Sequence, residues 1–505
     1  MTTLADRIRL LSESGLFDQH WYAERYPDVL RCGMSPAEHF VRIGLHMGRK
    51  PSKDQNAAAA SAFLAACRTI KPADNAISDE VREKIFASRL FDAAWYRSHY
   101  SPDLVADGDL LDDYFKQSAS NPLIDPGPLF STSSYAGKND ACGSVAPLIH
   151  ACNSGLSEGR PILDPRKVNE FLQQNSNVAC SAVQDLLDVS QPVDIFCWEE
   201  GNFFFTEIAK YLEVYLSDAG YATKRASDLP RLAAKTHNII VVAPHEFCVH
   251  GPGKGWDNKT LERTVYLNTE QWHTGWFSLA YRYMSMSNKA IDMNPASAAG
   301  LQSLGIRTAF LPITPLPETP FCVSNAALSH DFAKNRYIRP LTYPAELSER
   351  PYDILFVGAA NARREAALAS LAPTLAEHDA FLHCPRLNGP MRHGDPDTMV
   401  TSDLVQIARN SKILLNIHQG ESRYFEWHRL FLFGIMEGCV VLSEPCIPNT
   451  FVEADRDYLE CELEAMPERL RWLLETPDGK SEMRRIHANC GRLRQAVGEW
   501  ARLAA

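Results

Sequence analysis

An internal repeat near the start of the chain most constrains how it can fold. The run FDQHWY at Phe17–Tyr22 recurs as FDAAWY at Phe91–Tyr96, and a weaker third copy begins at Leu129. The end of the first copy also returns with the same spacing near residue 155. The matched pairs are His39 and His150, Gly44 and Gly155, Gly48 and Gly159, and Arg49 and Arg160. Such self-similarity predicts small structural units that stack on their neighbours.

The aromatic residues of the repeat have helical spacing. Phe17 lies four and five residues before Trp21 and Tyr22, which places these side chains on one face of a short helix. We interpret them as core anchors, and direct contact with a ligand is the alternative. The matched glycines suit helix C-termini that need positive φ. We expect a mainly α-helical repeat region over residues 1–160, with units near 14–51, 88–120 and 128–163 and a connector at 71–75.

After this region the pattern changes to alternating strands and helices. Apolar runs such as 193–198 and 238–243 predict buried strands, and a Pro-rich stretch interrupts the alternation before it starts again at 352–358. This predicts an α/β fold with two Rossmann-like domains, whose ligands bind beyond the carboxyl ends of the strands. The expected bounds are a linker at 161–192, a first domain at 193–325, a linker at 326–350 and a second domain with C-terminal helices at 351–505.

Charge and cysteine content narrow the possible partners. The formal net charge is −11 without a run rich in Lys or Arg, which argues against nucleic acid or an anionic membrane as the main partner. The 13 cysteines have no zinc-ligand or disulfide-framework spacing, so we expect reduced thiols. No stretch approaches the roughly 20 apolar residues that span a bilayer. We expect a cytoplasmic protein with at most peripheral membrane contact.

The second α/β domain opens with a candidate phosphate-binding turn. A strand ends at Gly358, and a small-residue turn leads through Asn361 into a helix that carries Arg363 and Arg364. Backbone N–H groups and the helix N-terminus of such a turn can hold a phosphate, and guanidinium groups match its geometry. Ordinary connections between strands and helices give the same pattern, and arginines on helix surfaces are common. Nucleotide binding by Gly358, Asn361 and Arg364 is therefore one of two interpretations.

A longer segment, residues 416–444, combines a polar loop, an apolar helix and a buried strand. The loop carries Glu426, and the helix carries Arg429 and, near its end, Glu437. The segment resembles the donor-sugar half of GT-B glycosyltransferases, especially bacterial polysaccharide enzymes of glycosyltransferase family 4 and the CgeB-like branch. The N-terminal repeats are similar to repeats found beside glycosyltransferase domains in bacterial surface-polysaccharide proteins.

The resemblance implies a GT-B fold and a nucleoside-diphosphate sugar as donor, with no further cofactor. It implies that Glu426 or Glu437 holds the ribose hydroxyls, and that Arg429 with Lys412 offsets the charge of the departing diphosphate. The family pattern has two glutamates eight residues apart, whereas these lie at positions 426 and 437, so their individual roles stay open. Glu437 could equally be a surface carboxylate at a helix C-terminus, and Arg429 an arginine at the surface or core edge.

Polar residues that follow two strands of the first domain are candidates for the reacting groups. His245 follows the predicted strand at 238–243, and Glu270 follows the one at 264–267. A carboxylate or imidazole there could act as general base toward an acceptor hydroxyl, or stabilise a developing oxocarbenium charge. Polar residues at strand ends are also common as caps and as hydrogen-bonding partners in loops.

The sequence therefore predicts a glycosyltransferase that acts without a metal ion, since no DxD-type carboxylate motif follows a strand. The donor would be a UDP-, GDP- or dTDP-sugar, and the acceptor a glycan, a lipid-linked molecule or a protein in bacterial surface-glycan synthesis. The repeats could bind the acceptor or a protein partner, and retaining and inverting courses both stay open. Two alternatives remain: a non-catalytic GT-B-like protein that binds a sugar nucleotide or a partner, and a sugar-nucleotide epimerase.

Overall fold

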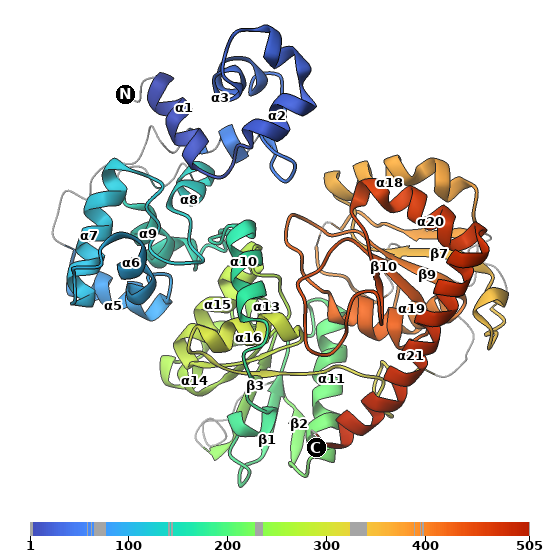
Figure 1. Cartoon of the computed structure of the whole chain (residues 1–505). Helices are drawn as coiled ribbons and strands as arrows, with labels where there is room; N and C mark the ends of the chain where they lie inside the picture. Colours follow the sequence, from blue (N-terminus) through green and yellow to red (C-terminus); the bar gives the residue numbers. More distant parts are fainter. Residues whose placement is uncertain are drawn as a thin grey trace. The chain divides into compact units, whose positions relative to one another are not determined.

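The structure is a computed structural model (Figure 1), and it describes residues 4–57, 59–61, 63–64, 77–139, 142, 145–227, 236–323, 341–387, 389–393, 395 and 398–503. The chain divides into two compact units, one of residues 1–168 with 273–278 and one of residues 169–272 with 279–505. The predicted connector at 71–75 lies outside the described residues, and the predicted linker at 326–350 is described only from residue 341.

The first unit is mainly helical (Figure 1). Its described helices are α1 (Leu4–Glu13), α2 (Gln19–Arg25), α3 (Pro36–His39), α5 (Asp79–Ser88), α6 (Ala93–Tyr100), α7 (Asp107–Ser120), α8 (Thr132–Lys138) and α9 (Pro147–His150). Short 3₁₀ or π-helical turns accompany them at η1 (Pro27–Arg31), η2 (Phe40–Gly44) and η4 (Ala151–Gly155).

Three of these helices begin at matched positions of the sequence. The capping residues are Asp18 for α2, Asp92 for α6 and Ser131 for α8, and each side chain accepts a hydrogen bond from the backbone N–H three residues further on. Such a cap satisfies one of the backbone donors that the first turn of a helix leaves without a partner. The same local signal therefore starts a helix in all three places.

The first and third copies share one buried contact. The hydroxyl of Tyr22 lies 3.2 Å from Nδ1 of His39, and the hydroxyl of Tyr135 lies 2.8 Å from Nδ1 of His150. Both histidines are at least nine-tenths buried, so each tyrosine satisfies a ring nitrogen that water cannot reach. In the middle copy, Tyr96 donates instead to a carboxylate, that of Asp113, at 3.0 Å.

Glycines shape the first and third copies in the same way. A Cβ added at Gly44 would lie 2.0 Å from the tyrosine hydroxyl, and one added at Gly155 would lie 2.4 Å from it. Four residues later, Gly48 and Gly159 have φ of 67° and 65°, a conformation that glycine adopts without steric cost. The first position of each pair requires glycine because a tyrosine hydroxyl approaches it closely, and the second because its backbone has a positive φ.

Of each aromatic pair in the first two copies, the tyrosine is the core residue. Tyr22 and Tyr96 are fully buried, whereas Trp21 and Trp95 are partly exposed. The expectation that the tryptophans are core anchors holds only in part: Trp21 packs against the edge of the core without being enclosed by it, because adjacent helical residues point in different directions. Trp95 stacks on His99, with ring centroids 4.0 Å apart.

The second unit contains two β-sheets whose strand pairs are all parallel. The strands of the first sheet are β1 (Val193–Phe196), β2 (Thr223–Arg225), β3 (Asn238–Val242), β4 (Val265–Asn268), β5 (Lys289–Asp292) and β6 (Arg307–Phe310). Those of the second are β7 (Tyr352–Val357), β8 (Ala380–His383), β9 (Ser411–Asn416), β10 (Val440–Ser443) and β11 (Leu459–Glu460). Within the described residues, the strand orders are β2-β1-β3-β4-β5-β6 and β11-β10-β9-β7-β8.

Helices connect and cover these strands. They are α10 (Pro165–Asn175), α11 (Phe203–Asp218), α13 (Pro244–Phe247), α14 (Asn258–Arg263), α15 (Gly275–Ser287), α16 (Pro295–Ser303), α18 (Ala362–Ala376), α19 (Thr401–Arg409), the π-helix η8 (Trp427–Ile435), α20 (Met466–Glu475) and α21 (Pro477–Leu503). The central strands are buried along nearly their whole length, as expected for parallel sheets with both faces covered. The predicted fold class is confirmed: two Rossmann-like α/β domains follow a mainly helical region.

Candidate active site

The strand order of each sheet marks where a ligand would bind. In the first sheet the order reverses between β1 and β3, and in the second between β7 and β9. Loops from the two strands at such a switch point leave in opposite directions, which opens a crevice at the carboxyl edge of the sheet. The loops that follow β7 and β9 are therefore the natural walls of a site in the second domain.

Two arginines straddle the switch point of the second sheet. Arg429, from η8, donates from Nη1 to the carbonyl oxygen of Val357 at the end of β7 (3.1 Å) and from Nη2 to Oδ1 of Asn416 at the end of β9 (2.8 Å). Arg364, from the first turn of α18, donates from Nε to the carbonyl oxygen of Ile417, just after β9, at 3.0 Å. Both arginines are more than nine-tenths buried.

Gly358 allows both guanidinium groups to approach the backbone. A Cβ added there would lie 2.9 Å from Nη1 of Arg429 and 3.0 Å from Nη1 of Arg364. Asn361 caps α18 by accepting from the backbone N–H of Arg364 (2.9 Å), and its Nδ2 donates to the carbonyl oxygen of Gln419 (2.9 Å). The predicted nucleotide-binding residues Gly358, Asn361 and Arg364 thus lie together at this turn.

Glu426 is the carboxylate of this cluster. Its Oε1 lies 2.7 Å from Nη2 of Arg429 and 3.7 Å from Nη2 of Arg364. Burial alone would raise the pKa of Glu426, but the two arginines outweigh that effect and lower it. Burial and the neighbouring Arg429 lower the pKa of Arg364 to about 10, so both groups remain charged at neutral pH. The cluster therefore carries two positive charges and one negative charge.

Arg429 has one hydrogen-bond donor that the described residues do not use. Its Nε is buried and has no hydrogen-bond partner among the described residues. A buried donor left unsatisfied costs about 1–3 kcal/mol, so a bound acceptor at this position would stabilise the site. The π-helix that carries Arg429 is itself a rare element that occurs mostly at functional sites.

Several hydrogen bonds join the segment around Glu426 to the first Rossmann-like domain. Nε2 of Gln271 donates to Oε1 of Glu426 at 3.2 Å. Nδ2 of Asn294 donates to the carbonyl oxygen of Phe425 at 2.5 Å, and Nε1 of Trp427 donates to the carbonyl oxygen of Ile313 at 3.0 Å. The cluster of the second domain thus lies against the strand ends of the first.

A strained residue shapes the corresponding edge of the first sheet. Ala243, directly after β3, has φ 53° and ψ 66°, which is unusual for a residue with a side chain. The chain then turns into α13, which carries His245 and Glu246. Oε2 of Glu246 accepts from the backbone N–H of Asn202, in the loop after β1, at 3.0 Å. Glu246 therefore occupies the switch point between β1 and β3.

Glu270 and His245 lie side by side at this edge. Oε1 of Glu270 lies 3.4 Å from Nε2 of His245. Burial, together with repulsion from Glu246, raises the pKa of Glu270 to about 7. Burial also lowers the pKa of His245 to about 3, with a further contribution from His250. At neutral pH the imidazole is neutral, and the Glu270 carboxyl is divided between its protonated and ionised forms.

Lys412 and Glu437 are not brought together with the other predicted residues. Lys412 is the second residue of β9, and its Nζ pairs with Oδ1 of Asp353, near the start of β7, at 2.7 Å. Glu437 follows the C-terminal end of η8 and pairs with Arg409, the last residue of α19, at 2.5 Å. Both lie toward the amino ends of the strands, whereas Arg364, Arg429 and Glu426 lie at the carboxyl ends.

Two residues of the site, Glu246 and Gln271, are not among the functional residues that the sequence predicts. Glu246 modifies the pKa of Glu270, and Gln271 bridges the two domains. Both sit beside residues that were selected, directly after strand ends, and that position is the signal that could have identified them. Arg363, beside the selected Arg364, is held by Glu444, with Nη1 to Oε2 at 2.9 Å.

Neither a metal cluster nor a membrane span is found in the described part of the chain. No group of three or more His, Cys, Asp or Glu side chains in that part could hold a metal ion. None of its helices is long and apolar enough to cross a bilayer.

No family model and no curated protein matches the chain. Among solved structures it is similar to Anabaena Alr3699/HepE in complex with UDP and glucose, with 10% identity and a TM-score of 0.36 over 61% of this chain and 98% of that one. It is also similar to the glycosyltransferase SnogD from Streptomyces nogalater, with 12% identity and a TM-score of 0.30 over 62% and 99%. A third similar structure is the glycosyltransferase VinC in complex with dTDP, with 13% identity and a TM-score of 0.23 over 62% of this chain and 99% of that one. Likenesses this distant do not bear on the chemistry of the site.

Proposed function

We propose that the protein is a glycosyltransferase that uses a nucleoside-diphosphate sugar. The observation that carries the proposal is the pair of buried arginines, Arg364 and Arg429, at the switch point between β7 and β9. Two guanidinium groups held beside one glycine, with a single carboxylate between them, suit a ligand with at least two negative charges. A nucleoside diphosphate has that charge.

The second domain supplies the groups for the donor. The diphosphate would lie against Gly358 and accept from Arg364 and Arg429, whose buried Nε is available to an acceptor. The arginines and Gln271 all approach Oε1 of Glu426, so its Oε2 is the oxygen offered to hydroxyl groups of the ribose. This arrangement supports Glu426, rather than Glu437, as the hydroxyl-binding glutamate.

The first domain supplies the candidate base. In the proposed step, the acceptor hydroxyl attacks the anomeric carbon, a new C–O bond forms, and the bond to the phosphate oxygen breaks. The nucleoside diphosphate leaves with the bonding electrons, and its charge is balanced by Arg364 and Arg429. The hydroxyl proton passes to a carboxylate, and a pKa of about 7 suits Glu270 for that transfer at neutral pH. A pKa of about 3 makes His245 a much weaker proton acceptor.

The finer features of the proposal follow from the sequence resemblance to family 4 and CgeB-like enzymes. We propose a glycan, lipid-linked or protein acceptor in bacterial surface-glycan synthesis, with the N-terminal repeats binding the acceptor or a protein partner. Transfer would proceed without a metal ion and with no cofactor besides the donor itself. The scattered cysteines support a cytoplasmic location.

Calorimetry with UDP-, GDP- and dTDP-sugars, followed by a donor hydrolysis assay, tests this function. We expect one nucleotide series to bind and its sugar to be released slowly to water. Binding without hydrolysis or transfer would favour the non-catalytic alternative, and interconversion of the bound sugar would favour an epimerase. Failure of all three series to bind would contradict the proposal.

A further inference from the structure

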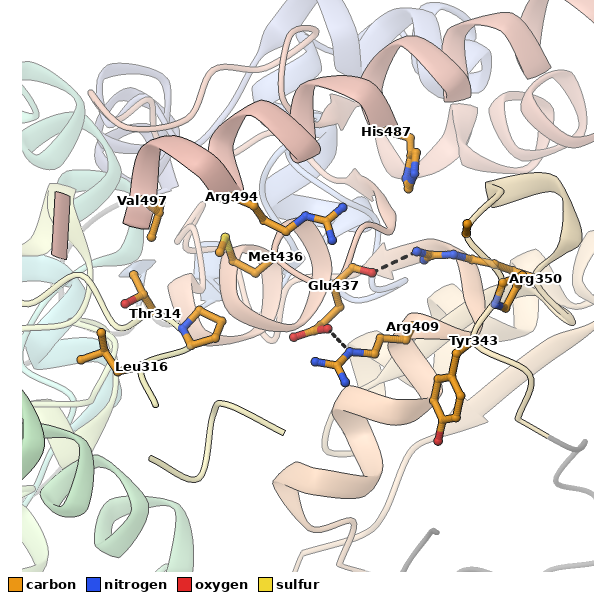
Figure 2. A pocket seen from close by; sticks show the side chains of 13 residues that line it. Thr314, Leu316, Tyr343, Arg350, Arg409, Met436, Glu437, His487, Arg494 and Val497 are labelled. Carbon is orange, nitrogen blue, oxygen red and sulfur yellow. Dashed lines mark hydrogen bonds and ion pairs between the residues drawn. The ribbon is translucent and has the colours of Figure 1, made fainter. Parts of the chain in front are cut away.

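A second charged cavity lies at the opposite edge of the second sheet. It has a volume of about 480 Å³, and Figure 2 shows the side chains that line it. Arg350 precedes β7, Arg409 precedes β9 and Glu437 precedes β10, so the cavity opens at the amino ends of these strands. Arg364 and Arg429 lie at the carboxyl ends, and none of the site residues at that edge lines this cavity.

Among the described residues, positive charge is in excess in the lining of the cavity. Three arginines belong to that lining, Arg350, Arg409 and Arg494, against one carboxylate, that of Glu437. Glu437 is already paired with Nε of Arg409 at 2.5 Å (Figure 2). Nδ1 of His487 lies 2.8 Å from the carbonyl oxygen of Gly438 and must donate to it, and burial lowers the pKa of this imidazole. His487 is therefore neutral at pH 7 and does not cancel the excess.

Two of the arginines converge on one point. A Cβ added at Gly438 would lie 2.9 Å from Nη2 of Arg350, 3.0 Å from Nη2 of Arg494 and 3.1 Å from Cε1 of His487. Arg350 comes from the segment before β7, whereas Arg494 and His487 come from α21 (Figure 2). Like charges repel at such short range, so an arrangement of this kind is stabilised by an anion between them.

The protein itself uses only part of these donors. Arg350 is 6% exposed and donates to the carbonyl oxygens of Ser411 (2.7 Å) and Glu437 (3.1 Å). These residues lie at the start of β9 and just after η8, so Arg350 caps the ends of two neighbouring elements. Its buried Nε has no hydrogen-bond partner among the described residues. Arg494 is exposed and interacts electrostatically with Glu437, which is itself in a close ion pair with Arg409. A donor on each arginine is thus left for a ligand.

The other half of the cavity is mostly apolar, with Thr314 as a polar residue on that side. Figure 2 places Leu316, Met436 and Val497 on the side away from Arg350 and His487. A cavity of this volume accommodates a small organic molecule rather than an inorganic ion alone. Its lining matches a ligand with an anionic group at one end and a nonpolar body at the other.

We propose that this cavity is a second ligand site, distinct from the donor site, which binds a small organic phosphate. The phosphate lies between Arg350 and Arg494, where two guanidinium groups supply paired donors. The nonpolar body of the ligand packs against Leu316, Met436 and Val497. The site stands on its own contacts and does not depend on the proposed sugar transfer.

The test uses phenyl phosphate, inorganic phosphate and phenol as probes in isothermal titration calorimetry of the full chain. An Arg429→Gln background weakens anion binding at the other edge of the sheet. We expect phenyl phosphate to bind at least tenfold more tightly than inorganic phosphate, because only the former fills the apolar half, and phenol to bind weakly. Arg494→Gln added to this background should weaken phenyl phosphate binding at least tenfold.

Arg484→Gln is the matched control. Arg484 is exposed on the same helix and does not line the cavity, so its loss removes the same charge and should leave phenyl phosphate binding unchanged. Because Arg494 is exposed, its replacement should leave the fold intact, as circular dichroism would show. Equal affinity with and without Arg494, equal losses in both variants, or no binding of phenyl phosphate would each overturn the proposal.

Discussion

At the scale of single residues, burial acts in opposite directions on two adjacent groups. Oε1 of Glu270 and Nε2 of His245 lie 3.4 Å apart, yet the pKa of Glu270 is raised to about 7 and that of His245 is lowered to about 3. Burial disfavours the charged form of both groups, which is the ionised form for the carboxyl and the protonated form for the imidazole, so it raises the first pKa and lowers the second. The pair therefore presents one group that exchanges a proton near neutral pH, and this is the carboxyl.

Replacement of Glu270 by Gln tests that role. Gln keeps the shape and hydrogen-bonding capacity but cannot accept a proton, so kcat/KM should fall by about 10²–10⁴ while donor binding is nearly unchanged. In the wild type, the rate should rise with pH up to about 7 and then level off, because the base acts in its ionised form. That rise should be absent from the Glu270→Gln variant.

Two further variants separate the neighbours of Glu270. Glu246→Gln removes the charge that helps to raise the pKa of Glu270, so the rise in rate should move to lower pH with its height preserved. Near-normal turnover of Glu270→Gln together with an inactive His245→Ala would transfer the role to the histidine. Full activity of both would contradict the assignment of this edge of the sheet.

Arg429 offers the corresponding test of the donor side. Arg429→Ala should weaken binding of the preferred nucleoside diphosphate by about 1.5–3 kcal/mol, the usual contribution of a charged hydrogen-bond partner. Arg423, exposed in the loop before η8, is the control for loss of a positive charge, and Arg423→Ala should bind normally. Calorimetry with UDP, GDP and dTDP measures both. Unchanged affinity of Arg429→Ala for all three nucleotides would remove Arg429 from the site.

At the scale of elements, the close approach of Gly44 to Tyr22 is the feature most open to mutation. A Cβ at Gly44 would lie 2.0 Å from the Tyr22 hydroxyl and 3.1 Å from Cδ2 of Phe40, and both rings are fully buried. Gly44→Ala should therefore destabilise the first unit by about 1–3 kcal/mol, the range for overpacking a core. Differential scanning calorimetry of the full chain measures the change.

Gly108 provides the control for that substitution. It lies in α7 of the same unit, and a Cβ added there would meet nothing within 4 Å. Gly108→Ala should be neutral or stabilising by up to about 1 kcal/mol, because Ala favours the helix. We expect turnover of a small soluble acceptor to survive in both variants. Equal stability of the two would show that the core around Tyr22 adapts to the added methyl group.

The sequence predicts elements well where hydrophobic runs are long. The strands β3 and β7 are predicted because each contains four consecutive apolar residues, IIVV and ILFV, whereas β5 and β11 are not predicted. β5 has the sequence KAID, with a charged residue at each end, and β11 has only two residues. Such short strands are stabilised by the neighbouring strands of the sheet, and the local sequence does not show this contribution.

The site was predictable in its parts but not in its assembly. A strand-end position predicts Glu270, the turn after a strand predicts Arg364, and the family resemblance predicts Glu426. All three lie at the carboxyl edges of the sheets. The hydrogen bond from Gln271 to Glu426 joins residues 155 positions apart, and no sequence pattern predicts a contact over that separation. Glu437 lies in the same segment as Glu426, but η8 separates the two and places Glu437 toward the other edge of the sheet.

At the scale of the whole molecule, a titratable group lies at a contact between the two Rossmann-like domains. Glu207 of α11 accepts a hydrogen bond from Oγ1 of Thr401, at the start of α19, at 2.5 Å. Burial raises the pKa of this carboxyl from 4.5 to about 7. Between these two values the folded state keeps a proton that the unfolded state has lost, so this group lowers the free energy of unfolding as pH rises.

Glu207→Gln isolates that contribution, because Gln resembles the protonated acid, can still accept from Thr401 and does not titrate. Relative to the wild type, the variant should gain on the order of 2–3 kcal/mol in free energy of unfolding between pH 4.5 and about 7, and no more above that. Urea unfolding at pH 5, 6, 7 and 8 measures the difference, and using a difference cancels the titration of every other group. Glu262→Gln, exposed on α14, controls for loss of a surface carboxylate. The difference between Glu207→Gln and wild type could instead stay constant over this range. That result would show that Glu207 is ionised in the folded protein, so that the contact between the two domains involves a charge rather than a neutral hydrogen bond.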